Sequence, residues 1–142
     1  MNISKLLDNP LFQLERGERP TKALLEDFVA WAPDNLPTKY LRFIRQCDGA
    51  RGDSPYTSGY IDLWTLERTR ERNSPGTLGD LPGFFAFADD GKDQLFAFDL
   101  RQPDGAAVCT VPSAAPSAEG LEELAPSFSE FLEHIVLMRG RL

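Results

Sequence analysis

Three aspartates and a lysine lie within five residues, Asp89–Asp90–Gly91–Lys92–Asp93, between two phenylalanine-rich segments. Closely spaced carboxylates are ligands that Ca²⁺ and Mg²⁺ prefer, so a metal site is the first chemistry to test. An EF-hand loop with Gly91 in its sixth position would begin at Ala86 and end at Ala97, and neither carries a ligand oxygen. Short loops of Asp and Gly are typical of β-hairpins. The cluster therefore favours a turn, and a metal-dependent enzyme that uses its carboxylates is the alternative.

Other residue types that catalyse reactions or hold cofactors are few and scattered. The single histidine, His134, is far along the chain from both Cys47 and Cys109, so no zinc-ligand spacing results. No Ser or Cys stands beside a base in a recognisable nucleophile context. The glycines at 76, 79 and 83 lack the Lys-Ser/Thr pair of a phosphate-binding loop. The sequence therefore predicts no catalytic residue, no metal and no cofactor.

The spacing of apolar residues predicts the elements that position these groups. The expected order is a helix over 20–33, a helix over 35–49, a strand over 60–64, a short helix over 65–73, three strands over 84–88, 94–100 and 107–111, and a final helix from Ser127. Runs of strands without strict alternation with helices indicate an α+β fold. We expect a single domain with a mostly antiparallel sheet flanked by helices, in the order α-α-β-α-β-β-β-α. The phenylalanine-rich strands are apolar on both faces, so helices are expected on both sides of the sheet.

Each helix is expected to begin at a capping residue and to bury an apolar stripe. Thr21, Thr65 and Ser127 are the expected N-caps, the last in a capping box with Glu130, and Gly49 is expected to end the second helix. The polar segment over 50–59 is expected to be a loop. The expected buried stripes are Leu24, Leu25, Phe28, Val29 and Ala32; Tyr40, Phe43, Ile44 and Cys47; and Phe128, Phe131, Leu132, Ile135 and Met138.

The net charge of −7 is carried by the second half of the chain. Residues 1–73 hold eleven acids and eleven bases, whereas residues 74–142 hold eleven acids and four bases. Such a surface repels nucleic acid and anionic lipid, and it attracts a basic partner. Charge therefore argues against nucleic-acid and membrane binding and favours a basic protein partner, although solubility alone would also account for it.

Length and composition predict one cytoplasmic domain over residues 1–142. The chain is 42% apolar and 26% charged, which is ordinary for a globular protein. No apolar run approaches the roughly 18 residues of a membrane span. The first residues lack the apolar core of a secretory signal, so both cysteines are expected to be reduced and packed. The oligomeric state is not predicted.

Three segments, in order, resemble the SUKH superfamily of Smi/Knr-like proteins. They are LPTKYLRFIRQCDG (36–49), LPGFFAFADDGKDQLFAFDLR (81–101) and LAPSFSEFLEHI (124–135), and the resemblance covers about residues 21–138. It implies a SUKH-like domain that acts as a non-catalytic immunity protein, which binds and neutralises a polymorphic bacterial toxin, often a nuclease. The matching positions imply a structural role only. They are Leu36, Tyr40, Phe43, Phe96, Phe98, Asp99, Phe128, Phe131 and Leu132.

The resemblance and the charge together predict a cognate protein toxin that is basic and acts on nucleic acid. A protein that handles phosphate must present Lys and Arg, and a carboxylate-rich protein competes for that surface. The candidate partner-binding residues are an acidic rim of Asp89, Asp90, Asp93, Asp104, Glu119, Glu122 and Glu123, with Tyr56 and Tyr60 as aromatic anchors. Two alternatives stay open. One is a regulatory protein-interaction scaffold without a toxin partner, and the other is a metal-dependent enzyme using Asp89, Asp90 and Asp93.

Overall fold

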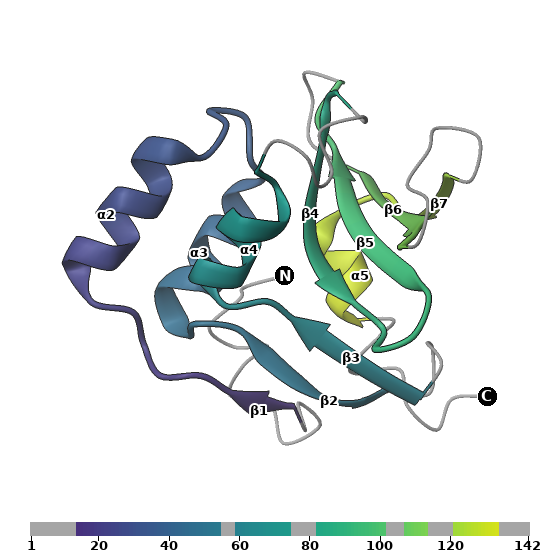
Figure 1. The fold of residues 1–142 in the computed structure, drawn as a ribbon, viewed down its shortest axis with the longest axis horizontal. Coiled ribbons are helices and arrows are strands. Elements are labelled where there is room, and N and C mark those ends of the chain that lie inside the picture. The colour runs from purple at the N-terminus through teal and green to yellow at the C-terminus, as the bar shows by residue number, and fades with distance from the viewer. Residues whose placement is uncertain (1–13, 55–58, 75–81, 102–106, 114–120, 134–142) are drawn as a thin grey trace.

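The computed structural model describes residues 14–54, 59–74, 82–101, 107–113 and 121–133. Seven antiparallel strands form one sheet in the order of the sequence, β1 to β7, and helices pack against it (Figure 1). The elements are β1 (Glu15–Arg16), α2 (Lys22–Trp31), α3 (Thr38–Gln46), β2 (Ala50–Ser54), β3 (Gly59–Leu63), α4 (Leu66–Arg72), β4 (Phe84–Asp89), β5 (Gln94–Asp99), β6 (Ala107–Pro112), β7 (Glu122–Ala125) and α5 (Phe128–Leu132). The expected α+β class with a mostly antiparallel sheet is confirmed.

The sheet has two parts that meet at a short junction. Strands β3 and β4 share only two residue pairs, Asp62 with Asp89 and Leu63 with Ala88. Beyond the junction β1–β3 run across the lower part of Figure 1, whereas β4–β6 stand upright. The carboxamide of Asn73, just after α4, accepts a hydrogen bond from Ala86 N at 2.9 Å and donates one to Ala86 O at 2.8 Å. This side chain therefore replaces a neighbouring strand along the edge of β4 that β3 leaves open.

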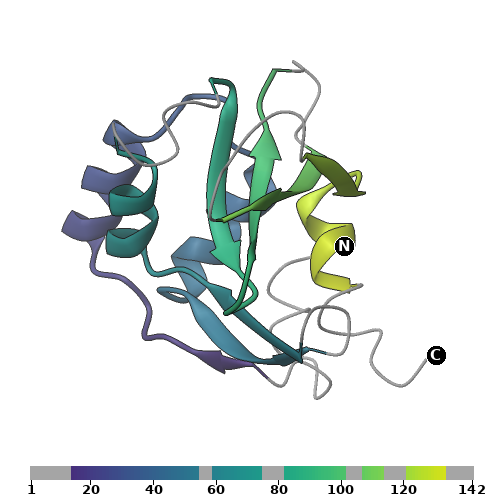
Figure 2. The ribbon, with the colours of Figure 1, turned by 45° about the vertical axis from the view of Figure 1, so that its right-hand side comes forward.

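The main core is aromatic and lies between the sheet and the helices. The rings of Phe87 on β4 and Phe98 on β5 stack with centroids 4.2 Å apart. Tyr40 of α3 and Phe128 of α5 both pack on this pair, at centroid distances of 5.1 to 5.8 Å. Figure 2 shows α5 lying along the β6 side of the sheet. Alternation of side chains along β4 and β5 therefore places one phenylalanine row under α3 and α5.

The opposite face of the strands carries a second, smaller cluster. Its buried members are Trp64, Ala86, Leu95, Ala97 and Val111. None of them belongs to a helix, whereas the buried apolar residues of α2, α3, α4 and α5 all lie in the main core. The expectation of helices on both faces is therefore not met in the part of the chain that the structure describes. The alanine side chains on this face are small, so the packed layer is thin, and the Trp64 ring covers part of it.

The predicted N-caps are confirmed. The side chains of Thr21, Thr65 and Ser127 accept hydrogen bonds from backbone N–H groups in the first turns of α2, α4 and α5. The prediction for Gly49 is wrong, because α3 ends at Gln46 with Cys47 as its C-cap. Gly49 has φ +83°, and a Cβ there would lie 2.7 Å from Leu63 O. Glycine is required at this position by close backbone packing and not by the helix end.

Strands β1, β2 and β7 were not expected from the sequence. Residues 50–54, expected in a loop, form β2, whose backbone pairs with both β1 and β3. Strand β7 is also new, and its burial pattern shows three exposed residues before the buried Ala125. Strands of this kind contain polar residues or glycine, and they lack the apolar alternation by which strands are recognised in a sequence. Pairing of their backbones with neighbouring strands stabilises them instead. The four expected strands, over 60–64, 84–88, 94–100 and 107–111, are confirmed with small shifts of their ends.

The apolar stripe of α2 is only partly buried. Phe28 and Ala32 are buried, but the side chains of Leu24 and Val29 are 39% and 46% exposed. The stripe of α3 is buried as expected, and so is the described part of the α5 stripe. Ile135 and Met138 lie outside the described residues. Helix α2 therefore packs through one edge of its apolar face and leaves the other edge open.

Candidate functional site

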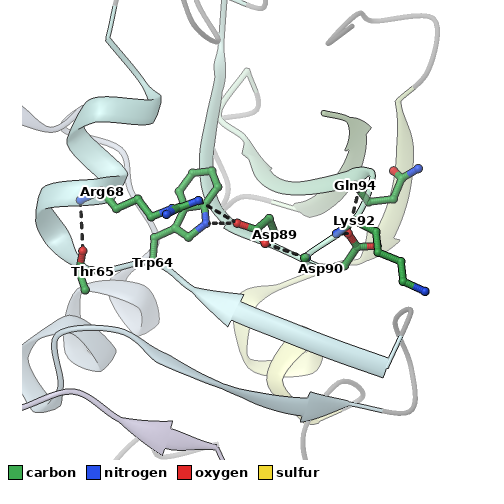
Figure 3. A network of polar contacts seen from close by, with 8 residues as sticks. Trp64, Thr65, Arg68, Asp89, Asp90, Lys92 and Gln94 are labelled. Atoms are coloured by element: carbon green, nitrogen blue, oxygen red, sulfur yellow. Dashed lines mark hydrogen bonds and ion pairs between the residues drawn. The ribbon is translucent and has the colours of Figure 1, made fainter. Parts of the chain in front are cut away.

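The acidic cluster Asp89–Asp93 forms the turn between β4 and β5. Asp89 Oδ1 accepts a hydrogen bond from Gly91 N at 2.8 Å, and Asp90 Oδ1 accepts bonds from the backbone N–H groups of Lys92 and Gln94 (Figure 3). Gly91 has φ +77°, the left-handed conformation that such a turn requires. The interpretation of the cluster as a hairpin turn is confirmed, because its carboxylates fold the loop that carries them.

Asp89 also joins the turn to α4. Its Oδ2 accepts a hydrogen bond from Trp64 Nε1 at 2.6 Å, and Arg68 Nη2 lies 3.7 Å from the same oxygen (Figure 3). The guanidinium groups of Arg68 and Arg72 lie 5.9 and 5.3 Å from the centroid of the Trp64 ring. Charge-assisted bonds of this kind fix a side chain in one orientation. Asp89 is therefore a structural link between the sheet and the helix.

The members of the expected rim differ in what they offer to a partner. Asp90 is only 5% exposed, and Asp89 is largely covered by its contacts with α4, whereas Asp93 is exposed. Glu122 and Glu123 are exposed on β7, two strands beyond β5. Asp104, Glu119 and Tyr56 lie outside the described residues. The structure thus gathers three acids at the turn and places the other two on a separate edge of the sheet.

Tyr60 lies beside the turn. A Cβ on Gly91 would lie 2.8 Å from Tyr60 Cδ1, so the tyrosine ring covers the glycine and is itself half-buried. Burial raises the pKa of Tyr60, and the negative charge of Asp62 adds to the rise. The expected anchor is therefore partly used in packing, and its remaining exposed surface borders the acidic turn.

Sequence reasoning missed a row of charges across four strands. The residue pairs place Glu15 of β1 beside Arg51 of β2, Arg51 beside Asp62 of β3, and Asp62 beside Asp89 of β4. Asp62 is half-buried, and burial together with the facing Asp89 raises its pKa, against the smaller opposing effect of Arg68 and Arg51. Two carboxylates opposite each other are unfavourable in a sheet. The alternation of Tyr60, Asp62 and Trp64 was the signal that could have placed Asp62 on this face.

Two hollows of similar size flank α4. A polar cleft of about 410 Å³ lies between α4 and strands β1–β3, and a groove of about 400 Å³ lies between α4 and α2. Glu67 and Glu71 of α4 line both, so these two side chains form the ridge that separates the cleft from the groove. Asp62 and Arg51 lie in the cleft, and Leu24 and Phe28 lie in the groove. The hollows offer polar and apolar contacts side by side.

The described residues contain no group of three or more His, Cys, Asp or Glu side chains that could hold a metal ion. Both cysteines are buried and free. Burial raises the pKa of Cys47 to about 12 and that of Cys109 to about 11, so neither forms a thiolate nucleophile at neutral pH. Within the described part of the chain, each helix is too short or too polar to cross a membrane.

A family model described as the SMI1 / KNR4 family (SUKH-1) matches residues 20–134. This segment runs from the start of α2 past the end of α5, and it contains the acidic turn and α4. No curated protein matches the chain.

Proposed function

Because the chain belongs to the SMI1 / KNR4 family (SUKH-1), we propose that it is a non-catalytic immunity protein that neutralises a bacterial protein toxin by binding it. The single observation that carries the proposal is the family match over residues 20–134. Both cysteines are buried and protonated, and the carboxylates of Asp89 and Asp90 accept hydrogen bonds within their own turn. These groups serve the fold, which supports a binding role. We place the protein in the cytoplasm, where its buried thiols stay reduced.

The charge of the molecule supports a basic partner. The net charge is −7, and Asp93, Glu122 and Glu123 are exposed. A toxin that acts on nucleic acid presents Lys and Arg to phosphate, and an acidic surface competes with that substrate and speeds association. We propose that Asp93, Glu122 and Glu123 act in this attraction, together with Asp104 and Glu119. Asp89 and Asp90 contribute to this attraction indirectly, because their hydrogen bonds hold the turn that carries Asp93.

A specific complex of this kind buries on the order of 1,600 Å² in total, with apolar or aromatic anchors inside a polar rim. Tyr60 beside the acidic turn is the proposed anchor among the described residues, and Tyr56 is the second. Aromatic anchors supply much of the affinity of such complexes, whereas rim charges mainly set the association rate.

The test is toxicity rescue. Each protein encoded beside this chain is expressed in a sensitive cell with and without this chain, and each purified pair is passed through size-exclusion chromatography with light scattering. Rescue together with a complex of one copy of each is expected. If no neighbouring gene product is toxic, or if rescue occurs without a complex, the proposal fails. A stable complex with a non-toxic protein would favour the regulatory scaffold instead.

A further inference from the structure

The groove between α2 and α4 exposes one apolar side chain, Leu24, that the sequence pattern predicts to be buried. Leu24 of α2 is 39% exposed and lines the groove with Phe28 and with Leu66 of α4. Phe28 and Leu66 belong to the main core, so the floor of the groove is continuous with the core of the protein. A hollow of about 400 Å³ with such a floor has room for one or two apolar side chains.

Carboxylates dominate the rim of this groove. Asp27 of α2 and Glu67 and Glu71 of α4 line it, against one arginine, Arg70. The Arg70 guanidinium lies 5.3 Å from the centroid of the Trp31 ring, so a cation–π contact already engages it. The groove is therefore apolar at its floor and negative at its rim.

The polar cleft on the other side of the ridge continues this negative potential. Five carboxylates and three arginines line it, and Arg68 among them is engaged by Trp64 and Asp89. Asp62 faces Asp89 across the β3–β4 junction, and Arg51 and Arg68 are the cations nearest to it. A further positive group in the cleft would lie among Asp62, Glu67 and Glu71 and would offset the repulsion between Asp62 and Asp89.

We propose that these two hollows form one docking surface for a basic protein partner. An apolar side chain of the partner enters the groove between α2 and α4, and a neighbouring arginine or lysine of the same segment lies in the cleft, across the ridge of Glu67 and Glu71. The inference rests on the proposed function, because it takes the toxin as this partner. It locates the specific contact at α4, whereas the acids on β7 serve long-range attraction.

Charge complementarity selects this occupant. A second copy of the chain would bring its own carboxylate rim against Asp27, Glu67 and Glu71, and like charges in close contact are strongly unfavourable. Nucleic acid and anionic lipid are repelled for the same reason. A purely apolar ligand would fill the groove but leave the cleft without a contact. A basic segment that also carries an apolar residue satisfies both hollows.

The binding test uses a minimal probe, the dipeptide N-acetyl-leucyl-arginine amide, titrated into the ¹⁵N-labelled protein. Saturable shifts of backbone amide signals are expected in α2, α4 and β3. The neutral analogue with citrulline in place of arginine should bind roughly threefold more weakly, as expected for the loss of one partly exposed charge pair. The analogue with glycine in place of leucine should also bind more weakly, because it leaves the groove empty.

Two pairs of isosteric variants assign the shifts to the ridge. Glu67→Gln with Glu71→Gln should reduce the affinity for the dipeptide, whereas Glu122→Gln with Glu123→Gln on β7 should leave it unchanged. Shifts without saturation, equal binding of the citrulline analogue, or equal loss in both variant pairs would overturn the inference. The titration needs no toxin. It can therefore fail while toxicity rescue succeeds, or succeed while rescue fails, and the two proposals are judged separately.

Discussion

At the residue scale, the most informative pair is Asp62 and Asp89. The two carboxylates face each other across the β3–β4 junction, yet among the described residues only Asp89 accepts a short hydrogen bond, from Trp64 Nε1 at 2.6 Å. Asp89 also has Arg68 at 3.7 Å. Asp89 thus stabilises the fold, whereas the negative charge of Asp62 beside it destabilises the fold. Unfavourable local arrangements of this kind are typical of surfaces kept for binding.

Replacing the two aspartates separately should have opposite effects. Asp62→Asn should raise the free energy of unfolding by about 0.2–1 kcal/mol, because it removes a like-charge pair. Asp89→Asn should lower it by about 1.5–3 kcal/mol, because it weakens a charge-assisted hydrogen bond of the buried Trp64 indole. Urea denaturation at neutral pH measures both. Equal effects of the two substitutions would contradict the roles assigned here.

The gain from Asp62→Asn should depend on pH. The pKa of Asp62 lies above its ordinary value of 3.8, so the fold disfavours the charged form. A raised acid pKa means that the favourable contribution of this group is fully present below 3.8 and is lost as the pH rises through the folded-state pKa. The difference between wild type and variant should therefore be largest near neutral pH and shrink in acid. A difference that grows on acidification would refute this.

At the element scale, α4 organises the molecule. Thr65 caps its start, Asp48 Oδ1 accepts a hydrogen bond from Leu66 N at 2.7 Å, and Asn73 at its end binds the backbone of β4. A helix of only seven residues has little stability by itself. These contacts hold it over the junction between the two parts of the sheet, where its Glu67 and Glu71 divide the cleft from the groove.

Asn73→Ala should therefore destabilise the protein. The substitution removes two hydrogen bonds, at 2.8 and 2.9 Å, so the backbone N–H and C=O of the buried Ala86 lose these partners. The free energy of unfolding should fall by about 1–3 kcal/mol. Asn35→Ala is the matched control, because it removes one hydrogen bond from the exposed Asn35 to Leu100 O. Thermal and urea denaturation should show a much larger effect for Asn73. Comparable losses would mean that the edge of β4 does not depend on α4.

At the scale of the whole molecule, part of the negative charge lies away from the proposed contact surface. The described residues of β6, β7 and α5 include Glu122, Glu123 and Glu130 and carry no lysine or arginine. The two hollows lie around α4, toward the other end of the sheet. Long-range attraction depends on total charge, whereas affinity depends on the side chains that are desolvated at the contact. The two can therefore be altered separately.

Asp93→Asn with Glu122→Gln and Glu123→Gln should slow association with the proposed basic partner and leave dissociation nearly unchanged. Removing three exposed charges should lower the association rate constant about threefold to tenfold at low salt, with little effect at high salt, where screening already removes the attraction. Stopped-flow or surface-based kinetics at two ionic strengths measure this. An unchanged association rate, or a change confined to dissociation, would show that these acids do not steer the partner.

Much of the fold could be predicted from local patterns. The caps Thr21, Thr65 and Ser127 and the buried stripe of α3 follow from hydrogen-bonding chemistry and helical spacing, which act within a few residues. The turn at Asp89–Asp93 follows from the chemistry of aspartate and glycine. The resemblance to the SUKH superfamily rested on the segments 36–49, 81–101 and 124–135, and the family match over residues 20–134 confirms it.

Only the tertiary structure decided which of these residues are exposed and which are buried. Strand β2 and the exposure of Leu24 depend on neighbours distant in sequence, because a strand without apolar alternation is defined by its pairing and a helix stripe is buried only where another element covers it. Asp90 looks like a surface acid in the sequence, but the fold buries it in its own turn. Asp62 looks ordinary, but strand register places it opposite Asp89 and beside a cleft. The sequence determined the elements and the overall charge, and the packing of distant segments determined the surface.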